Sequence, residues 1–196
     1  MKHSLWRVGV CGLFLACGAA SAGAAGKART GPGGGSAPAT QPGVKESLAD
    51  GVVEFSRPAD WEEAKKNRTP LRAAWVSPDH KGMILVEVWP EGDINEGTGA
   101  KTVAKLRADR KKQAGVKVLM EPAVEKDPRF AMRIHEKYEY TADGTVDDVL
   151  RLGRKVGGRV LMVTVWSKSP DDARDKEIHQ TGETVMLSAT PVKKKK

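Results

Sequence analysis

Residues 154–167 read RKVGGRVLMVTVWS, and this stretch indicates the fold. Gly157 and Gly158 separate two apolar runs, and glycines tolerate the positive φ angles of a tight hairpin turn. The run at 160–166 is apolar on both sides of a strand, so we expect it at the centre of a sheet. The core is therefore predicted to form around an antiparallel hairpin.

Other runs predict further strands around this hairpin. In residues 130–140 apolar and polar side chains alternate with a period of two, as in a half-buried strand, although Glu136 interrupts the apolar side. Asp143 and Gly144 form the next turn, and the turn formers at 77–82 join another hairpin. The expected strands are 52–56, 71–76, 83–89, 116–121, 130–140, 146–155 and 159–168.

Two helices are expected, one at 100–113 and one that follows the sequence SPDD at 169–172. In the second helix, Ser169 is predicted to be the N-cap, and Pro170 takes the first helical position. Gly182 is expected to weaken this helix by up to about 1 kcal/mol relative to alanine. Its predicted inward stripe consists of Ile178, Thr181, Val185 and Ala189.

The order of elements is thus β-β-β-α-β-β-β-β-α. Together with FSRPADW at 55–61, the double-glycine hairpin and SPDD, this order resembles the PsbP-like superfamily, whose bacterial members include DcrB-like and LpqN-like exported proteins. The likeness covers most of residues 50–190. It implies an α+β fold, an αβα sandwich in which an antiparallel sheet of about six to seven strands carries two main helices.

The first 22 residues have the three parts of an export signal. Lys2 and Arg7 form a basic start, 8–20 is an apolar run, and Ala20 and Ala22 fit an A-x-A cleavage rule. We therefore expect cleavage after Ala22. The apolar run is too short for a helix that spans a membrane, which needs about 20 residues.

A bacterial lipoprotein box is the alternative reading of this leader. The sequence LACG at 15–18 would make Cys17 the lipidated first residue of the mature chain. Ala16 suits such a box, whereas Phe14 and Leu15 are bulkier than the residues usually found there. We favour an exported protein, periplasmic or extracellular, with anchoring at the membrane through Cys17 as the alternative.

Composition divides the rest of the chain. Residues 23–43 contain seven Gly and three Pro and no large apolar side chain, which predicts a flexible tether. Residues 44–192 form a single cysteine-free domain, followed by a lysine tail at 193–196. Eight of the 33 basic side chains lie outside this domain, so it holds 25 basic and 25 acidic groups. A neutral domain lacks the basic surface of a specific nucleic-acid binder.

No motif in the sequence indicates catalysis or a cofactor. A G-x-S-x-G elbow and a P-loop are both absent, and we expect no enzymatic activity, no cofactor and no metal. His135 and His179 have no second ligand at helical or strand spacing, so each is expected to be solvated or packed in the core. Asp143, Asp147 and Asp148 are expected to serve a turn.

Two further groups of side chains are candidates for binding. Trp89 and Trp166 lie at predicted strand ends, where they could line a groove for a small apolar ligand. Core packing is the alternative for both, and we expect Trp166 to be largely buried. The acidic loop with Glu91, Asp93 and Glu96 is expected to be solvated rather than a cation site.

These observations predict an exported, non-enzymatic accessory, binding or assembly protein of the cell envelope, and we expect a monomer. Its partner would be an envelope protein or a small apolar ligand. One alternative is an envelope hydrolase, which a cleft with a shifted histidine or carboxylate pKa would favour over a smooth apolar groove. Another is a surface-binding protein with weak contacts to anionic surfaces through its tail, Lys193, Lys194, Lys195 and Lys196.

Overall fold

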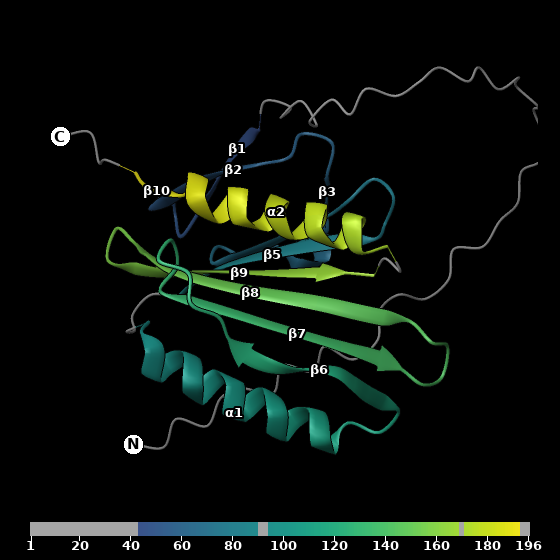
Figure 1. Ribbon diagram of the computed structural model, residues 1–196. Coiled ribbons are helices and arrows are strands. Elements are labelled where there is room, and N and C mark those ends of the chain that lie inside the picture. Colours follow the sequence, from purple (N-terminus) through teal and green to yellow (C-terminus); the bar gives the residue numbers. More distant parts are fainter. Residues whose placement is uncertain (1–42, 90–93, 169–170, 193–196) are drawn as a thin grey trace, which may run out of the picture. The chain divides into compact units, whose positions relative to one another are not determined.

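The computed structural model describes residues 43–89, 94–168 and 171–192 (Figure 1). The expected export signal at 1–22, with Cys17 and Ala22, lies outside the described residues, as do the tether up to residue 42 and the lysine tail. Among the described helices, none is long and apolar enough to cross a membrane.

Seven antiparallel strands form the main sheet, in the order β3-β4-β5-β9-β8-β7-β6. Their bounds are β3 Glu62–Glu63, β4 Arg72–Val76, β5 Gly82–Trp89, β6 Val116–Val124, β7 Met132–Tyr140, β8 Val146–Val156 and β9 Arg159–Ser167. The apolar strand β9 occupies the central place, as expected. In the turn before it, Gly157 and Gly158 have φ angles of 56° and 77°.

A smaller sheet contains β1 (Val44–Leu48), β2 (Val53–Arg57) and β10 (Thr190–Pro191), with β2 in the middle. The strand expected at 52–56 is β2, but it lies in this sheet rather than in the main one. Three strands were not predicted. β1 is mostly polar, β3 has only two residues, both glutamates, and β10 has two residues including a proline. A short 3-10 helix, Lys65–Asn67, follows β3.

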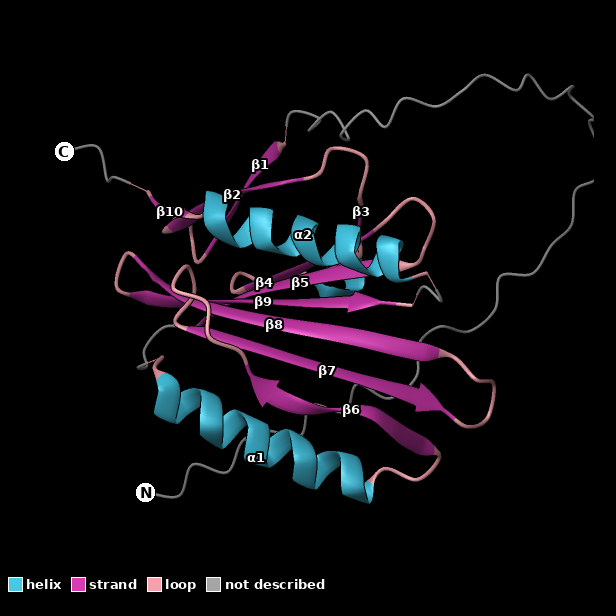
Figure 2. Cartoon of the chain, in the orientation of Figure 1, coloured by secondary structure: helices cyan, strands magenta, loops and turns pink. Residues whose placement is uncertain are grey.

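Two helices cover opposite faces of the main sheet (Figure 2), which confirms the α+β class. Helix α1, Glu96–Lys112, packs on β6 and β7, whereas α2, Asp172–Ser188, packs on β8 and β9. The cap of α2 is Asp171, whose carboxylate accepts a hydrogen bond from the amide of Ala173 at 2.9 Å. The predicted cap, Ser169, lies outside the described residues.

Gly182 has a different role in α2 from the one expected. A Cβ atom at this position would lie 2.1 Å from Cγ2 of Val165 in β9, so the glycine allows the helix to approach the sheet. Thr181, expected on the inward stripe, is only half-buried, and Met186 is fully buried in its place. The inward face is therefore rotated from the predicted one, and this rotation decides which polar side chains of α2 face the sheet.

Candidate functional site

A cleft of about 330 Å³ lies between α2 and the strands β7 and β8. Alternation along β7 directs Arg133, His135 and Lys137 toward α2. Its lining is mainly charged and comprises Arg133, His135, Asp148, Asp172, Asp175, Lys176, His179, Gln180 and Glu183. The described side chains around it therefore form a polar site rather than an apolar groove.

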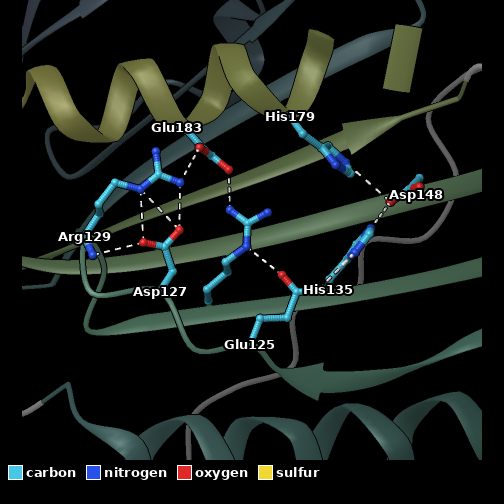
Figure 3. Close-up of polar contacts among 8 residues, drawn as sticks. Glu125, Asp127, Arg129, His135, Asp148, His179 and Glu183 are labelled. Atoms are coloured by element: carbon cyan, nitrogen blue, oxygen red, sulfur yellow. Dashed lines mark hydrogen bonds and ion pairs between the residues drawn. The ribbon is translucent and has the colours of Figure 1, made fainter. Parts of the chain in front are cut away.

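Two histidines meet one aspartate at the centre of this site, each from a different element (Figure 3). His135 on β7 donates from Nε2 to Oδ1 of Asp148 on β8 at 2.5 Å. Nε2 of His179 on α2 lies 3.4 Å from the same oxygen. The two rings are nearly perpendicular, at 85°, with their centroids 5.2 Å apart. One carboxylate oxygen is thus shared by two imidazoles.

The three groups shift one another's proton affinity. Burial would lower the pKa of His135, but the hydrogen bond and charge of Asp148 raise it above the ordinary 6.5. Burial lowers the pKa of His179 below 6.5, against the attraction of Asp148. Burial would raise the pKa of Asp148, but the hydrogen bond from His135 and the nearby cations keep it below 3.8. Asp148 is therefore ionised, with a readily protonated histidine on one side and a neutral one on the other.

Lys137 holds the second oxygen of the aspartate. Its Nζ lies 3.3 Å from Oδ2 of Asp148 and 3.3 Å from Oδ2 of Asp175 on α2. The other oxygen of Asp175 accepts a hydrogen bond from the buried hydroxyl of Ser167. Oδ1 of Asp148 is thereby left to the two histidines.

A chain of ion pairs borders the opposite end of the cleft (Figure 3). Arg133 contacts Glu125 at 2.6 Å and also pairs with Glu183 on α2. Arg129 bridges Asp127 at 2.7 Å and Glu183 at 3.0 Å. The hydrogen bonds from Arg129 lower the pKa of Asp127 to about 2. These pairs attach α2 to the loop that precedes β7.

A second charged cluster lies on the face that α1 covers. Glu136, which interrupts the apolar side of β7, is buried with 1% of its surface exposed. It accepts hydrogen bonds from Arg110 of α1 at 3.0 and 3.2 Å and from Arg151 of β8 at 2.6 Å. The guanidinium of Arg110 also lies 3.9 Å from the ring centre of Tyr138.

Several expectations for polar residues are corrected by this arrangement. Of the three aspartates assigned to a turn, only Asp143 serves one, accepting from the amide of Thr145 at 2.9 Å. Asp147 and Asp148 lie in β8 and are buried. A search for metal ligands spaced along a single helix or strand missed the partners of His135 and His179. These two histidines lie on different elements and come together only in the folded chain.

The two tryptophans do not form a shared groove. In the pairing of β5 with β9, Trp89 faces Val160 whereas Trp166 faces Met83, so the rings lie at opposite ends of the strand pair. Trp89 packs beside the core under α1. Trp166 is half-buried rather than largely buried, because it points away from α2 at the end of β9. Glu91 and Asp93 and the side chain of Glu96 lie outside the described residues.

The site offers ligand-binding and acid–base groups but no hydroxyl or thiol nucleophile among its described lining residues. Ser167 is fully buried and donates to Asp175. Nitrogen and oxygen donors on a rigid support suit a cation or a polar ligand.

No family model and no curated protein matches the chain. Among solved structures, it is similar to a protein from Bacteroides thetaiotaomicron VPI-5482, with a TM-score of 0.50 and 13% identity over 79% of this chain. The chain spans half the length of that protein.

Two further similar structures belong to the kinds of protein that the sequence resembles. Cyanobacterial PsbP from Synechocystis sp. PCC 6803 has a TM-score of 0.45 and 11% identity, with 83% of this chain and 98% of that one covered. LpqN, involved in cell envelope biogenesis of Mycobacterium tuberculosis, has a TM-score of 0.43 and 13% identity, with 76% and 90% covered. These likenesses concern the fold alone. The described residues have the α+β arrangement that the sequence resemblance implies, an antiparallel sheet that carries two main helices.

Proposed function

We propose that the chain is an exported, non-enzymatic accessory protein of the cell envelope that binds a ligand in the cleft under α2. The observation that carries this proposal is the convergence of His135, Asp148 and His179 at one end of an open cleft. The leader with its A-x-A sequence supports export. Ligand-binding clefts usually contain a few convergent polar groups that fix the orientation of the ligand.

The ligand is polar in this proposal. Charged side chains of both signs line the cleft, so a polar molecule or ion would retain partners on leaving water. The small apolar ligand expected from Trp89 and Trp166 has no such support, because those two side chains do not share a groove. An envelope protein is a second candidate for this cleft, since a charged side chain inserted by it would make the same contacts as a polar ligand.

A hydrolase is the second candidate function. It is favoured by the 2.5 Å hydrogen bond between His135 and Asp148, since a carboxylate that orients a histidine is the arrangement of a general base. The absence of a nucleophilic side chain from the described lining weighs against a covalent mechanism. The shifted pKa values of His135, His179 and Asp148 in the cleft also favour a hydrolase. We place binding first because the charged lining offers partners to a polar ligand, whereas the described lining has no nucleophile.

Retention of a ligand by a tagged full chain tests the proposal. Gln180 lines the cleft and is exposed, so Gln180→Trp should obstruct the cleft without disturbing the core. Thr184→Trp is the matched control, on an exposed position of α2 that does not line the cleft. Mass spectrometry of protein and small-molecule partners from envelope extract should find a partner that Gln180→Trp loses and Thr184→Trp keeps.

Two results would contradict the binding proposal. Equal retention by both tryptophan variants would place any partner elsewhere, for example on the lysine tail, whose contacts with anionic surfaces remain a prediction. Ester or amide hydrolysis by the purified chain that His135→Ala abolishes would establish the hydrolase instead.

The mature N-terminus tests export separately. We expect secreted protein to begin near Gly23 and to carry no labelled palmitate. Incorporation of label that Cys17→Ser abolishes would show that the protein is a lipoprotein anchored at the membrane.

A further inference from the structure

Three nitrogen and oxygen atoms in the cleft are spaced as ligands of one metal ion. They are Nε2 of His135, Nε2 of His179 and an oxygen of Asp148, and the potential ligand atoms of the three residues lie within 4.8 Å of one another. Two ligands at 2.0–2.1 Å from a tetrahedral ion are about 3.3 Å apart. The 3.4 Å between His179 and Asp148 already fits this spacing, and the 2.5 Å between His135 and Asp148 would need to open by less than about 1 Å.

His179 supplies a second, independent observation. Its side chain is about nine-tenths buried, and its Nε2 has no hydrogen-bond partner among the described residues. That atom points at Asp148 (Figure 3). Buried polar atoms in proteins are nearly always paired, so an orphaned imidazole nitrogen aimed at a carboxylate indicates a ligand between or beside them.

The surroundings of His135 add a supporting carboxylate. Its other ring nitrogen, Nδ1, lies 3.4 Å from Oε1 of Glu125. Glu125 is itself fixed by Arg133 at 2.6 Å. Metal-ligating histidines usually donate their second N–H to such a carboxylate, which orients the ring and raises its basicity.

We propose that His135, Asp148 and His179 bind a divalent first-row transition metal ion of the zinc class. This inference rests on the proposed function, because it names the ligand of the same cleft. Two imidazoles and one carboxylate suit zinc, cobalt or nickel, whereas calcium and magnesium take oxygen ligands. Three protein ligands leave a coordination position toward the cleft for water or for a donor atom of a partner.

Lys137 is compatible with a bound cation. It contacts Oδ2 of Asp148, so it does not occupy Oδ1, the oxygen shared by the histidines. Asp175 lies 3.3 Å from the same ammonium and stabilises it when Asp148 turns toward the metal. Asp172, 3.7 Å from the ammonium, adds a further negative charge.

Titration of the full chain with Zn²⁺, followed by calorimetry, tests the site. Cysteine thiolates are zinc ligands, so all samples carry Cys11→Ser and Cys17→Ser to remove the leader thiols. We expect one equivalent of Zn²⁺ to bind and to raise the melting temperature. His135→Leu, Asp148→Asn and His179→Leu should each lower the affinity more than about 100-fold, and Glu125→Gln should lower it about 10- to 100-fold.

His80→Ala is the matched control, since His80 lies in the turn between β4 and β5, outside the cleft lining. It should leave zinc affinity unchanged, and an excess of Ca²⁺ should not displace the zinc. The visible absorption of bound Co²⁺ should show a tetrahedral site in the parent chain. This spectrum requires no variant, so it also tests the site if a variant fails to fold.

The outcomes separate this inference from the proposed function. Zinc binding that survives all three ligand substitutions, the absence of a tetrahedral Co²⁺ spectrum, or displacement by Ca²⁺ would overturn the metal site. If a partner is nevertheless lost in Gln180→Trp, the cleft binds another polar ligand and the proposed function stands. Zinc binding with no partner of the cleft would support the metal site and count against the accessory role.

Discussion

The two faces of the main sheet each contain a charged cluster, and the clusters differ in how completely their hydrogen bonds are made. Under α1, the carboxylate of Glu136 accepts three hydrogen bonds from Arg110 and Arg151. Under α2, Nε2 of His179 has no hydrogen-bond partner among the described residues, although it is buried. The carboxylate of Glu136 is thus fully paired within the protein, whereas His179 has unused binding capacity. On the α1 face, Oδ1 of Asp147 also lacks a hydrogen-bond partner among the described residues, but it lies 3.8 Å from the ammonium of Lys168.

This difference separates a structural cluster from a functional one. A buried charge whose hydrogen bonds are all made fixes the packing of the elements that supply its partners. A buried group without a partner lowers stability, and proteins tolerate such a loss mainly at functional sites. We therefore expect substitutions under α1 to affect folding and substitutions under α2 to affect binding.

The largest effect is expected at Glu136. Glu136→Gln removes the charge that neutralises Arg110 and Arg151, whose side chains are only 15% and 14% exposed. Loss of one partner from a buried ion pair costs about 3–5 kcal/mol. Chemical denaturation should show this decrease in the free energy of unfolding.

An exposed ion pair of α1 provides the control for Glu136. Arg107 lies 3.6 Å from Glu121, and these side chains are 50% and 58% exposed. Arg107→Gln should change the free energy of unfolding by no more than about 1 kcal/mol. Equal losses for Arg107→Gln and Glu136→Gln would mean that the cluster under α1 is not a structural one.

A medium effect is expected where α2 approaches the sheet. Gly182→Ala gains up to about 1 kcal/mol of helix propensity, but its methyl group would lie 2.1 Å from Val165. Overpacking of this kind costs about 1–3 kcal/mol, so we expect a net loss of stability. Thr184→Ala, on the exposed side of the same helix, should change stability by a few tenths of a kcal/mol. A stabilising Gly182→Ala would show that α2 can move away from β9.

His179→Leu should have a small effect on the folding of metal-free protein, in contrast to Glu136→Gln. The leucine keeps the side chain buried and removes a polar atom that lacks a hydrogen bond. We expect the free energy of unfolding to change by less than about 1 kcal/mol. A loss of about 3 kcal/mol or more in chelator-treated protein would make the cluster under α2 as structural as the one under α1.

The sequence allowed six of the seven strands of the main sheet to be predicted, all but β3, because those six carry local signals. The Asp143-Gly144 turn fixes the pairing of β7 with β8, in which Lys137 lies opposite Asp148. Alternation then places His135 and Asp148 on one face, as diagonal neighbours within reach of each other. Half of the candidate site was therefore present in the sequence pattern, although a test of ligand spacing along single elements did not find it.

The other half depends on contacts between distant residues. His179 faces the sheet because α2 is rotated so that Gly182 packs on Val165, and helical periodicity alone favoured Thr181 for the inward stripe. β1 and β10 form only because β2 lies between them, since neither has an apolar pattern of its own. Tertiary packing decides such features, and a single sequence carries little local signal for them.

The last and smallest effect is the opposite titration of the two histidines in chelator-treated protein. We expect the pKa of His135 to lie above 6.5, because Asp148 and Glu125 outweigh its burial, and that of His179 to lie below 6.5, because burial dominates. NMR titration of the imidazole protons should resolve the two. Asp148→Asn should lower the pKa of His135, since it removes the largest interaction that favours the charged ring.

The two shifts have opposite consequences for stability. The raised pKa of His135 stabilises the fold below pH 6.5, and this contribution disappears as the pH rises through its folded pKa. The lowered pKa of His179 favours the fold above pH 6.5, and stability decreases as the pH falls through its folded pKa. In the parent chain these two contributions should nearly cancel, so that the free energy of unfolding changes little with pH near 6.5. In His179→Leu only the contribution of His135 remains, and the free energy of unfolding should fall as the pH rises. An unchanged slope in His179→Leu would mean that folding does not lower the pKa of His179.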